Sequence, residues 1–262
     1  MNVLVFDIET VPDVEGGARL YDLDGLAPDE AAKAMTHIRQ MEAGTDFLRH
    51  YLHRIVAISV VMRSADRLNV WSLGSEASSE SDLVARFFDG IARYSPTLVS
   101  WNGSGFDLPV LHYRALRHGI EAPRYWEAGA EDSSFRWNNY LNRFHERHTD
   151  LMDMLSGYQP RASASLDAMA TLLGFPGKLG MSGAHVFEAY QAGNLAGIRD
   201  YCETDVLNTY LIYLRFELFR GRLDRRAYAL ECARVRQMLA DDGRKHLEDF
   251  LNAWVPQFED VD

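Results

Sequence analysis

The sequence predicts an α/β fold in which a mixed β-sheet is flanked by helices. Short apolar runs rich in β-forming residues alternate with longer runs of helical spacing, in the order strand, hairpin, helix, strand, helix and then further helices. The hairpin makes two neighbouring strands antiparallel, so the pattern is that of a mixed sheet rather than a βαβ alternation throughout. A chain of 262 residues fits one large domain of this class, with or without an embellishment.

Four segments have the composition of strands. Residues 2–6 are short, apolar and rich in β-formers, which is typical of a buried strand. Residues 54–62 and 68–73 are β-rich, and the polar and small residues 63–66 between them predict the hairpin. Residues 97–100 form a fourth short strand, and a further short apolar stretch surrounds Leu151.

The helices are marked by apolar spacing and by the residues at their ends. A helix predicted over residues 81–91 has a serine cap and an acidic first turn. The next has Pro109 near its first turn and ends at Gly119, the expected asymmetry of proline at the start and glycine at the end. Further helical segments are predicted at residues 28–41, which we expect at the periphery, and at 166–173, 195–218 and, as one or two helices, 225–253.

Composition excludes several classes of protein. No apolar run approaches the roughly 20 residues that cross a bilayer, so no membrane partner is expected. The N-terminus lacks the basic stretch and small-residue cleavage site of a signal peptide. Two cysteines are too few for a disulfide scaffold or a thiolate zinc site, and a reducing cytoplasmic location is the simplest interpretation.

The net charge of -11 argues against a protein that coats duplex DNA, because such binding depends on neutralising phosphates. It is compatible with a nuclease that holds a few nucleotides at a strand end. Such an enzyme has an acidic metal site, whose charge bound cations offset.

Three acidic motifs follow one another along the chain. Asp7 and Glu9 come directly after the first strand, Asp107 precedes a predicted helix, and Tyr201 and Asp205 lie within the long C-terminal helix. Crowded carboxylates raise one another's pKa, so a cluster of four usually exists to hold divalent cations. Ligand sets made only of oxygen select hard ions such as Mg²⁺ or Mn²⁺, which points to metal-dependent phosphoryl chemistry.

Each motif alone is weak evidence for a metal site, and its setting in the chain strengthens that evidence. Asp7 and Glu9 are two apart on an extended chain, which places both carboxylates on one face. Asp107 follows a glycine-containing loop that allows close approach of a ligand, although Asp is also a common helix cap. Tyr201 and Asp205 are four apart on a helix and share one face.

Together the motifs resemble those of a known family. The sequence is similar to the DEDDy group of 3′→5′ exonucleases, which share the ribonuclease-H-like fold, and in particular to the proofreading domain of family B DNA polymerases and its stand-alone bacterial relatives. The matching segments are residues 6–10, 101–103, 106–109 and 201–206. The sequences at 165–167 and 173–178 also resemble the family. The resemblance implies an exonuclease domain over residues 1–215 and a C-terminal helical extension, 216–262, packed on the same domain.

The resemblance implies that Asp7, Glu9, Asp107 and Asp205 hold two divalent cations, Mg²⁺ or Mn²⁺. Such a pair, about 4 Å apart, stabilises the attacking and leaving oxygens of an in-line displacement. Tyr201 completes the implied catalytic set. With an intrinsic pKa of about 10, it suits the orientation of a water molecule better than a general base.

Expected substrate contacts come from the same motifs and from one other segment. Thr10, Asn102 and Phe106 belong to the matched motifs, and Lys178 lies in a glycine-rich turn. Residues 124–147 interleave cations with aromatic residues, a mixture that binds single strands by phosphate contact and base stacking. Arg136 and Trp137 are the candidate substrate contacts in this segment, and Trp126 and Tyr140 are further candidates for stacking. The alternative is that these aromatic residues pack inward as core.

One alternative concerns the third motif. His145 and Asp150 have the spacing of the sister DEDDh group. Their stretch has no clear helical setting, whereas Tyr201 and Asp205 lie in a strongly patterned helix, so the tyrosine assignment is favoured. Asp150 then remains available as a supporting or structural carboxylate.

The predicted function is removal of nucleoside 5′-monophosphates from the 3′ ends of single-stranded DNA or RNA, with DNA favoured and DNA repair as the expected process. Direction and product are implied by the resemblance. RNA 3′-end trimming and a non-catalytic nucleic-acid-binding module are the alternatives. A haloacid-dehalogenase-type phosphatase also begins with a strand and an acidic motif, but Glu9 departs from its Asp-x-Asp pattern and no downstream Lys and paired-Asp signature fits.

Overall fold

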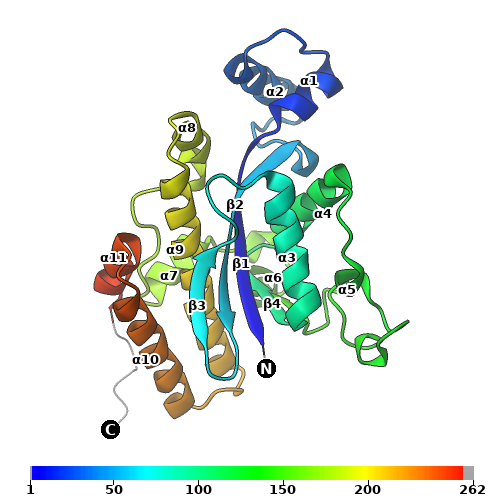
Figure 1. Cartoon of the computed structure of the whole chain (residues 1–262). Helices are drawn as coiled ribbons and strands as arrows, with labels where there is room; N and C mark the ends of the chain where they lie inside the picture. The colour runs from blue at the N-terminus through cyan, green and yellow to red at the C-terminus, as the bar shows by residue number, and fades with distance from the viewer. Residues whose placement is uncertain (1, 256–262) are drawn as a thin grey trace.

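The computed structural model describes residues 2–255 and is organised around one five-stranded sheet (Figure 1). The strand order is β3-β2-β1-β4-β5, in which β2 pairs antiparallel with both β1 and β3, whereas β4 is parallel to β1 and β5. The strands are β1 (Val3–Pro12), β2 (His53–Arg63), β3 (Leu68–Ser72), β4 (Thr97–Ser100) and β5 (His148–Asp150). The predicted α/β fold, with a mixed sheet flanked by helices, is confirmed.

Strand β1 is twice as long as predicted. It continues through Asp7 and Glu9 to Pro12, with Asp7 opposite Ser59 and Glu9 opposite Ala57 on β2. The expectation that the acidic pair follows the strand was therefore wrong, because β2 supplies pairing partners beyond the apolar run. The register shifts between Glu9 and Thr10, after the acidic pair.

Every predicted helix is present, with small shifts at the ends. Ser79, rather than a later serine, caps the helix after the hairpin by accepting the N–H of Asp82, and Gly119 ends the next helix with φ 64°. The predicted helices are α2 (Pro28–Ala43), α3 (Glu80–Tyr94), α4 (Asp107–His118), α7 (Leu166–Leu172), α9 (Leu195–Phe219), α10 (Arg225–Asp242) and α11 (Lys245–Ala253).

Several short elements were not predicted, because segments of three to eight residues carry too little periodicity to distinguish them from loops. Strand β5 is one of them. The others are the helices α1 (Val14–Tyr21), α5 (Pro123–Trp126), α6 (Leu151–Ser156) and α8 (Val186–Gln191), and the 3₁₀ turns η1 (His50–Leu52), η2 (Ser133–Phe135), η3 (Pro160–Ala162) and η4 (Gly183–His185).

Helices cover both faces of the sheet, with α9 and α10 on one side and α3 and α4 on the other (Figure 1). Val3 and Val5 of β1 pack in the core cluster of α9, whereas Leu4, Phe6 and Ile8 pack in that of α3 and α4. Since side chains alternate along a strand, Asp7 and Glu9 continue the row of Val3 and Val5 and face α9. Strand periodicity thus points both carboxylates at the helix of the third motif.

The C-terminal helices pack onto the same core. Tyr228 and Cys232 of α10 and Phe250 of α11 belong to the buried cluster that contains the β1 valines. Glu203 of α9 accepts hydrogen bonds from Arg244 at 2.6 Å and Ser72 at 2.8 Å. This glutamate, although inside the third motif, holds α11 and β3 to α9 and does not join the other carboxylates.

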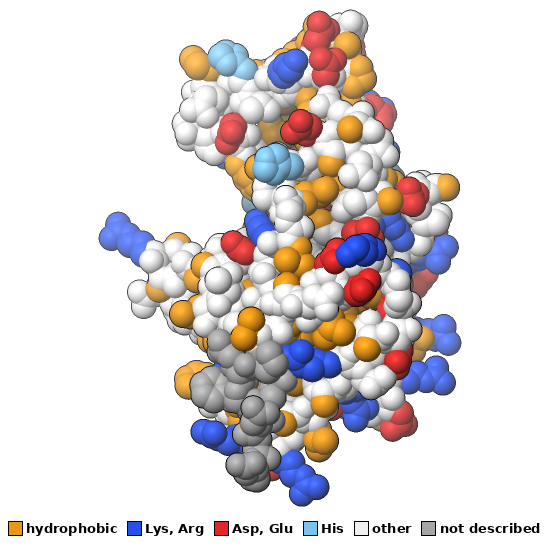
Figure 2. All heavy atoms as spheres, turned by 90° about the vertical axis from the view of Figure 1, so that its left-hand side faces the viewer, with side chains coloured by type: hydrophobic (Ala, Val, Ile, Leu, Met, Phe, Trp, Pro, Cys, Tyr) orange, Lys and Arg blue, Asp and Glu red, His pale blue; other side chains and the backbone are white. Residues whose placement is uncertain are grey.

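The connection between β1 and β2 forms a small helical lobe with its own core of Met35, Leu48 and Leu52. It contains α1, α2 and η1 and lies at one end of the molecule (Figure 1). On the face shown in Figure 2, acidic and basic side chains are interspersed rather than gathered into a basic surface. Among the described residues no helix is long and apolar enough to cross a membrane.

Candidate active site

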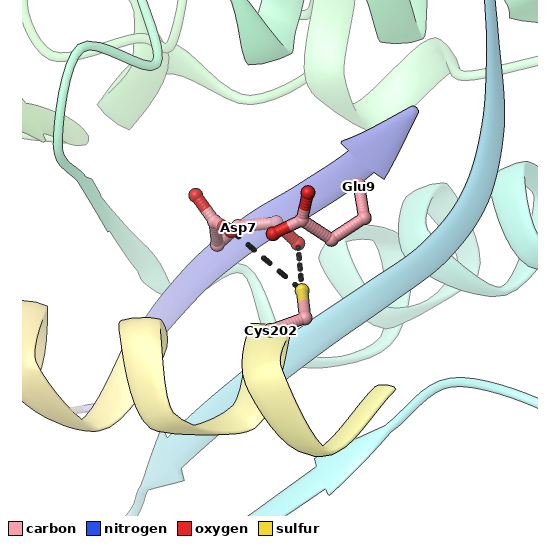
Figure 3. A group of neighbouring side chains, drawn as sticks. All are labelled: Asp7, Glu9 and Cys202. Atoms are coloured by element: carbon pink, nitrogen blue, oxygen red, sulfur yellow. Dashed lines mark hydrogen bonds between the residues drawn. The ribbon is translucent and has the colours of Figure 1, made fainter. Parts of the chain in front are cut away.

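Strand β1 and helix α9 bring the first group of candidate residues together. Ligand atoms of Asp7, Glu9 and Cys202 all lie within 4.8 Å of one another, with Cys202 reaching from α9 toward the two carboxylates (Figure 3). The Cys202 thiol donates to the Asp7 carboxylate, with Sγ 3.6 Å from Oδ2. Cys202 was not among the site residues predicted from the sequence, although it lies within the third motif, next to Tyr201.

Asp107 reaches the same place from the opposite side of β1. It is the first residue of α4, with Phe106 in the capping position, and its side chain is buried. Its Oδ1 accepts the backbone N–H of Ile8 at 3.2 Å, between Asp7 and Glu9 in the sequence. The carboxylate is therefore anchored to the strand that carries the first motif and does not act as an ordinary helix cap.

Asp205 and Tyr201 complete the group from α9, where both side chains are buried. The Tyr201 hydroxyl opposes the rise in the pKa of Asp205, and Asp205 Oδ1 is buried without a partner among the described residues. A buried carboxylate oxygen without a partner costs free energy, which indicates that a bound ligand is needed to pair with it.

Burial raises the pKa of all four carboxylates, and repulsion within the group adds to the rise at Asp7 and Glu9. Burial is the largest cause at Asp7 and Glu9, and neighbouring carboxylates add to it, so that the pKa of each lies well above its usual value. Burial raises the pKa of Asp107 to about 7 and that of Asp205 to about 6. The positive charge of Lys178 opposes the rise at Glu9 and Asp205, which places it near the cluster.

This donor set fits hard divalent cations. It consists of four carboxylates, one with an unpaired buried oxygen, and their crowding costs free energy that bound cations would offset. Burial, with the nearby carboxylates adding to it, raises the pKa of Cys202 well above its usual value, so the sulfur stays a thiol that donates to Asp7. A protonated thiol is a poor metal ligand, and the oxygen-only set is retained.

Asp150 supports the loop that precedes Asp107. Its two carboxylate oxygens accept the backbone N–H groups of Asn102 at 2.9 Å and Ser104 at 2.8 Å, as expected for a structural carboxylate. Asn102 has φ 64°, and its side chain folds so closely over Gly105 that a Cβ there would lie 2.4 Å from Oδ1. His145, which pairs with Asp150 in the alternative motif, accepts the backbone N–H of Asn139 at 3.0 Å.

Three of the expected substrate contacts adjoin the carboxylates. Thr10 follows Glu9 on β1, Phe106 precedes Asp107, and Lys178 influences the pKa of Glu9 and Asp205. The turn at Lys178 is held by its backbone N–H, which Asp167 accepts at 2.8 Å, while the side chain is exposed.

The segment over residues 124–147 is divided between core and surface. Tyr125, Phe135 and Tyr140 are buried, whereas Trp137 is 81% exposed. Tyr140 is only 3% exposed and donates its hydroxyl hydrogen to the carbonyl of Pro96 at 2.6 Å. The prediction that Tyr140 stacks on bases is therefore wrong, because its ring is part of the core beneath α3 and α4.

The position of this segment separates it from the carboxylates. Pro96 precedes β4 at the end of the sheet where β1 begins, since Thr97 donates to the carbonyl of Asn2. With a rise of about 3.3 Å per residue, the start of β1 lies roughly 20 Å from Glu9. No described contact connects Arg136 or Trp137 with the carboxylate cluster.

Comparison with known proteins relates this site to a family. Residues 45–254 match the family described as predicted 3′–5′ exonuclease related to the exonuclease domain of PolB. The matched range includes Asp107, Tyr201 and Asp205, while Asp7 and Glu9 precede it.

Two individual proteins are also similar to parts of the chain. A 39-residue stretch, 15% of this chain and 4% of the other, is 49% identical to DNA polymerase 1 of Sulfurisphaera ohwakuensis. The family B DNA polymerase of Pyrobaculum calidifontis aligns over 92% of this chain and 28% of its own length, with 19% identity and a TM-score of 0.45. The family match covers most of the chain, and the protein therefore belongs to the family of predicted 3′–5′ exonucleases related to the exonuclease domain of PolB.

Proposed function

We propose that this protein is a metal-dependent 3′→5′ exonuclease that removes nucleoside 5′-monophosphates from the 3′ end of single-stranded nucleic acid, with DNA favoured over RNA. The observation that carries the proposal is the convergence of Asp7, Glu9, Asp107 and Asp205 beside Tyr201, in a member of an exonuclease family. The relation of the family to the exonuclease domain of PolB, and the DNA polymerase name of one similar protein, favour DNA.

Asp7, Glu9, Asp107 and Asp205 would hold the divalent cations, Mg²⁺ or Mn²⁺. Such cations lower the pKa of an attacking water and stabilise the charge that develops on the scissile phosphate. The exposed Lys178 side chain, close to Glu9 and Asp205, is available to a phosphate oxygen of the substrate.

Tyr201 acts as a donor that orients the attacking water. Burial and the nearby carboxylates raise the pKa of its phenol, so the hydroxyl keeps its proton at neutral pH. A phenol in this state cannot serve as a general base, but it can hold a water molecule or a phosphate oxygen in place.

Thr10 is oriented as an acceptor. Burial lowers the pKa of His53 to about 4, so the imidazole is neutral, and its Nε2 faces the Leu48 carbonyl oxygen at 3.2 Å and must carry the hydrogen. His53 Nδ1 therefore accepts the Thr10 hydroxyl hydrogen at 2.9 Å. The remaining lone pairs of the Thr10 oxygen suit a donor such as a sugar hydroxyl.

The direct test is digestion of end-labelled single-stranded DNA and RNA oligonucleotides, resolved on a gel with Mg²⁺, with Mn²⁺ and with a chelator. We expect stepwise shortening of a 5′-labelled strand only when metal is present, with faster digestion of DNA. Metal-independent digestion, or none under any condition, would contradict the proposal. Faster digestion of RNA would make 3′-end trimming the function.

Tyr201→Phe is expected to lower the turnover rate by about 10- to 100-fold without eliminating activity. A hydrogen bond to a charged or reacting group is worth about 1.5–3 kcal/mol, whereas activation of water by the cations persists. His145→Ala should leave turnover within about twofold of wild type, because its described contact is with Asn139. Single-turnover digestion of a labelled strand measures both variants. The reverse order, with His145 essential, would favour the histidine subclass.

Asn102, Arg136 and Trp137 remain proposed substrate contacts, with Arg136 and Trp137 serving a part of the strand away from its 3′ end. Their double replacement by Ala is expected to weaken binding of a long oligonucleotide at least about tenfold, since base stacking is worth about 1–3 kcal/mol. A short oligonucleotide, confined to the carboxylate site, should bind as before. Fluorescence anisotropy in Ca²⁺ measures both, and unchanged affinity for the long strand would remove these residues from the binding surface.

We also propose that residues 216–262 are a helical extension of the domain formed by residues 1–215. The shared core of α9, α10 and α11 supports this, and residues 256–262 lie outside the described part of the chain. A reducing, cytoplasmic location is proposed because the two buried cysteines, Cys202 and Cys232, form no disulfide in the described part of the chain.

A further inference from the structure

Four aromatic rings from two distant segments meet beside the carboxylate cluster. Phe106 comes from the loop before α4, Phe47 and His50 come from the connection between α2 and β2, and His53 is the first residue of β2. The Phe106 ring centroid lies 5.6 Å from that of Phe47, 5.8 Å from that of His50 and 5.1 Å from that of His53. Phe47 and His53 are themselves 5.2 Å apart.

This ring cluster is joined directly to the residues of the site. Phe106 is the neighbour of Asp107, and His53 hydrogen-bonds to Thr10, the residue after Glu9. His50 Nε2 lies 2.8 Å from the carbonyl oxygen of Gly105, which fastens the lobe to the loop before α4. The rings therefore lie at the margin of the proposed metal site.

Phe47 is the open member of the cluster. It is 53% exposed and is not part of the lobe core, which is built from Met35, Leu48 and Leu52. Its position is nevertheless held, because its carbonyl accepts from Arg39 Nε at 3.0 Å and its N–H donates to Thr45 at 3.2 Å. An exposed aromatic side chain on a held backbone loses little conformational entropy when a ligand covers it.

We propose that Phe47, together with His50 and Phe106, forms a stacking platform for unpaired bases next to the 3′ terminus of the bound strand. The inference rests on the proposed exonuclease function and adds a binding contact from the helical lobe. Aromatic faces accept any base, so the platform would bind single strands with little sequence preference. A base held within a duplex is already stacked and cannot use it, so the platform also favours unpaired ends.

The experiment compares Phe47→Ala with Phe47→Trp and with the control Phe219→Ala. Phe219 is 79% exposed at the last residue of α9, and its replacement removes a similar ring from a different surface. Binding of a short fluorescent oligothymidylate is measured by anisotropy with Ca²⁺ in place of the catalytic metal. Digestion of the same strand with Mn²⁺ gives KM and kcat, and thermal unfolding confirms that each variant is folded.

We expect Phe47→Ala to weaken binding and raise KM by at least about tenfold, while kcat stays within about twofold, because stacking is worth about 1–3 kcal/mol per base. Phe47→Trp should bind as wild type or more tightly, and Phe219→Ala should match wild type. Wild-type affinity in Phe47→Ala, or a Phe47→Trp variant as weak as Phe47→Ala, would overturn the platform and leave the exonuclease function standing. A wild-type protein that neither binds nor digests the strand would overturn both.

Discussion

Asp205→Ala is expected to reduce exonuclease turnover at saturating substrate by at least about a hundredfold. Loss of a single preorganised electrostatic contact in an active site costs that much, and here the residue is a proposed metal ligand. Digestion of labelled single-stranded DNA with Mn²⁺ measures the effect. Asp66→Ala, which removes an exposed carboxylate from the β2–β3 hairpin, is the control and should digest as wild type.

The same variant should be as stable as the wild-type protein or more stable when metal is removed, because one of four crowded carboxylates is gone. The pKa of Asp205 is raised to about 6 and that of Asp107 to about 7 in the folded protein. Between the unfolded value of about 4 and these values the folded state binds more protons. The metal-free wild type should therefore lose stability as pH rises from about 4 to 7, and Asp205→Ala should lose less.

Urea unfolding in a chelator at pH 5 and pH 8 tests this dependence, and addition of Mn²⁺ at pH 8 should restore stability to the wild type by preferential binding to the folded state. Wild-type digestion by folded Asp205→Ala would remove this residue from the metal site. A metal-free protein whose stability rises between pH 5 and pH 8 would contradict the crowding of the carboxylates.

Arg114→Met is expected to lower the free energy of unfolding by about 3–5 kcal/mol. Arg114 is only 2% exposed and lies between two buried carboxylates, with Nε 2.7 Å from Glu80 Oε1 and Nη1 2.6 Å from Asp13 Oδ2. Its removal leaves both carboxylates buried without their main cation. Glu80 also accepts the backbone N–H of Ile55, so the substitution is expected to weaken the attachment of β2 as well.

The measurement is urea unfolding monitored by circular dichroism, with Arg86→Met as the matched control. Arg86 forms an exposed pair with Asp82 one helical turn earlier, and such pairs contribute about 0.3–0.5 kcal/mol. A loss below about 1 kcal/mol for Arg114→Met would show that the network adds little stability. The network also fixes the helix that begins with Asp107, so activity should fall in the same variant.

The local sequence determined most of the secondary structure. Helix periodicity, the serine caps and Gly119 are local features, and they located the long helices to within a few residues. The sequence did not predict the short elements, namely strand β5 and the helices α1, α5, α6 and α8. Such elements are stabilised by contacts with their neighbours rather than by a hydrophobic pattern of their own. The continuation of β1 through Asp7 and Glu9 likewise depends on its pairing with β2.

The four carboxylates and Tyr201 were predicted from the sequence as one site, because residue type, order and local setting agree across the three motifs, and the fold brings them together. Tertiary structure alone decided which other residues join them. Cys202 faces the carboxylates while Glu203 faces α11, and Tyr140 is buried while Phe47 is exposed. Tyr140 and Phe47 are both aromatic and Cys202 and Glu203 are neighbours on one helix, so the outcome depends on which distant segment covers each position. That information lies in the packing of the whole chain and not in any local window of its sequence.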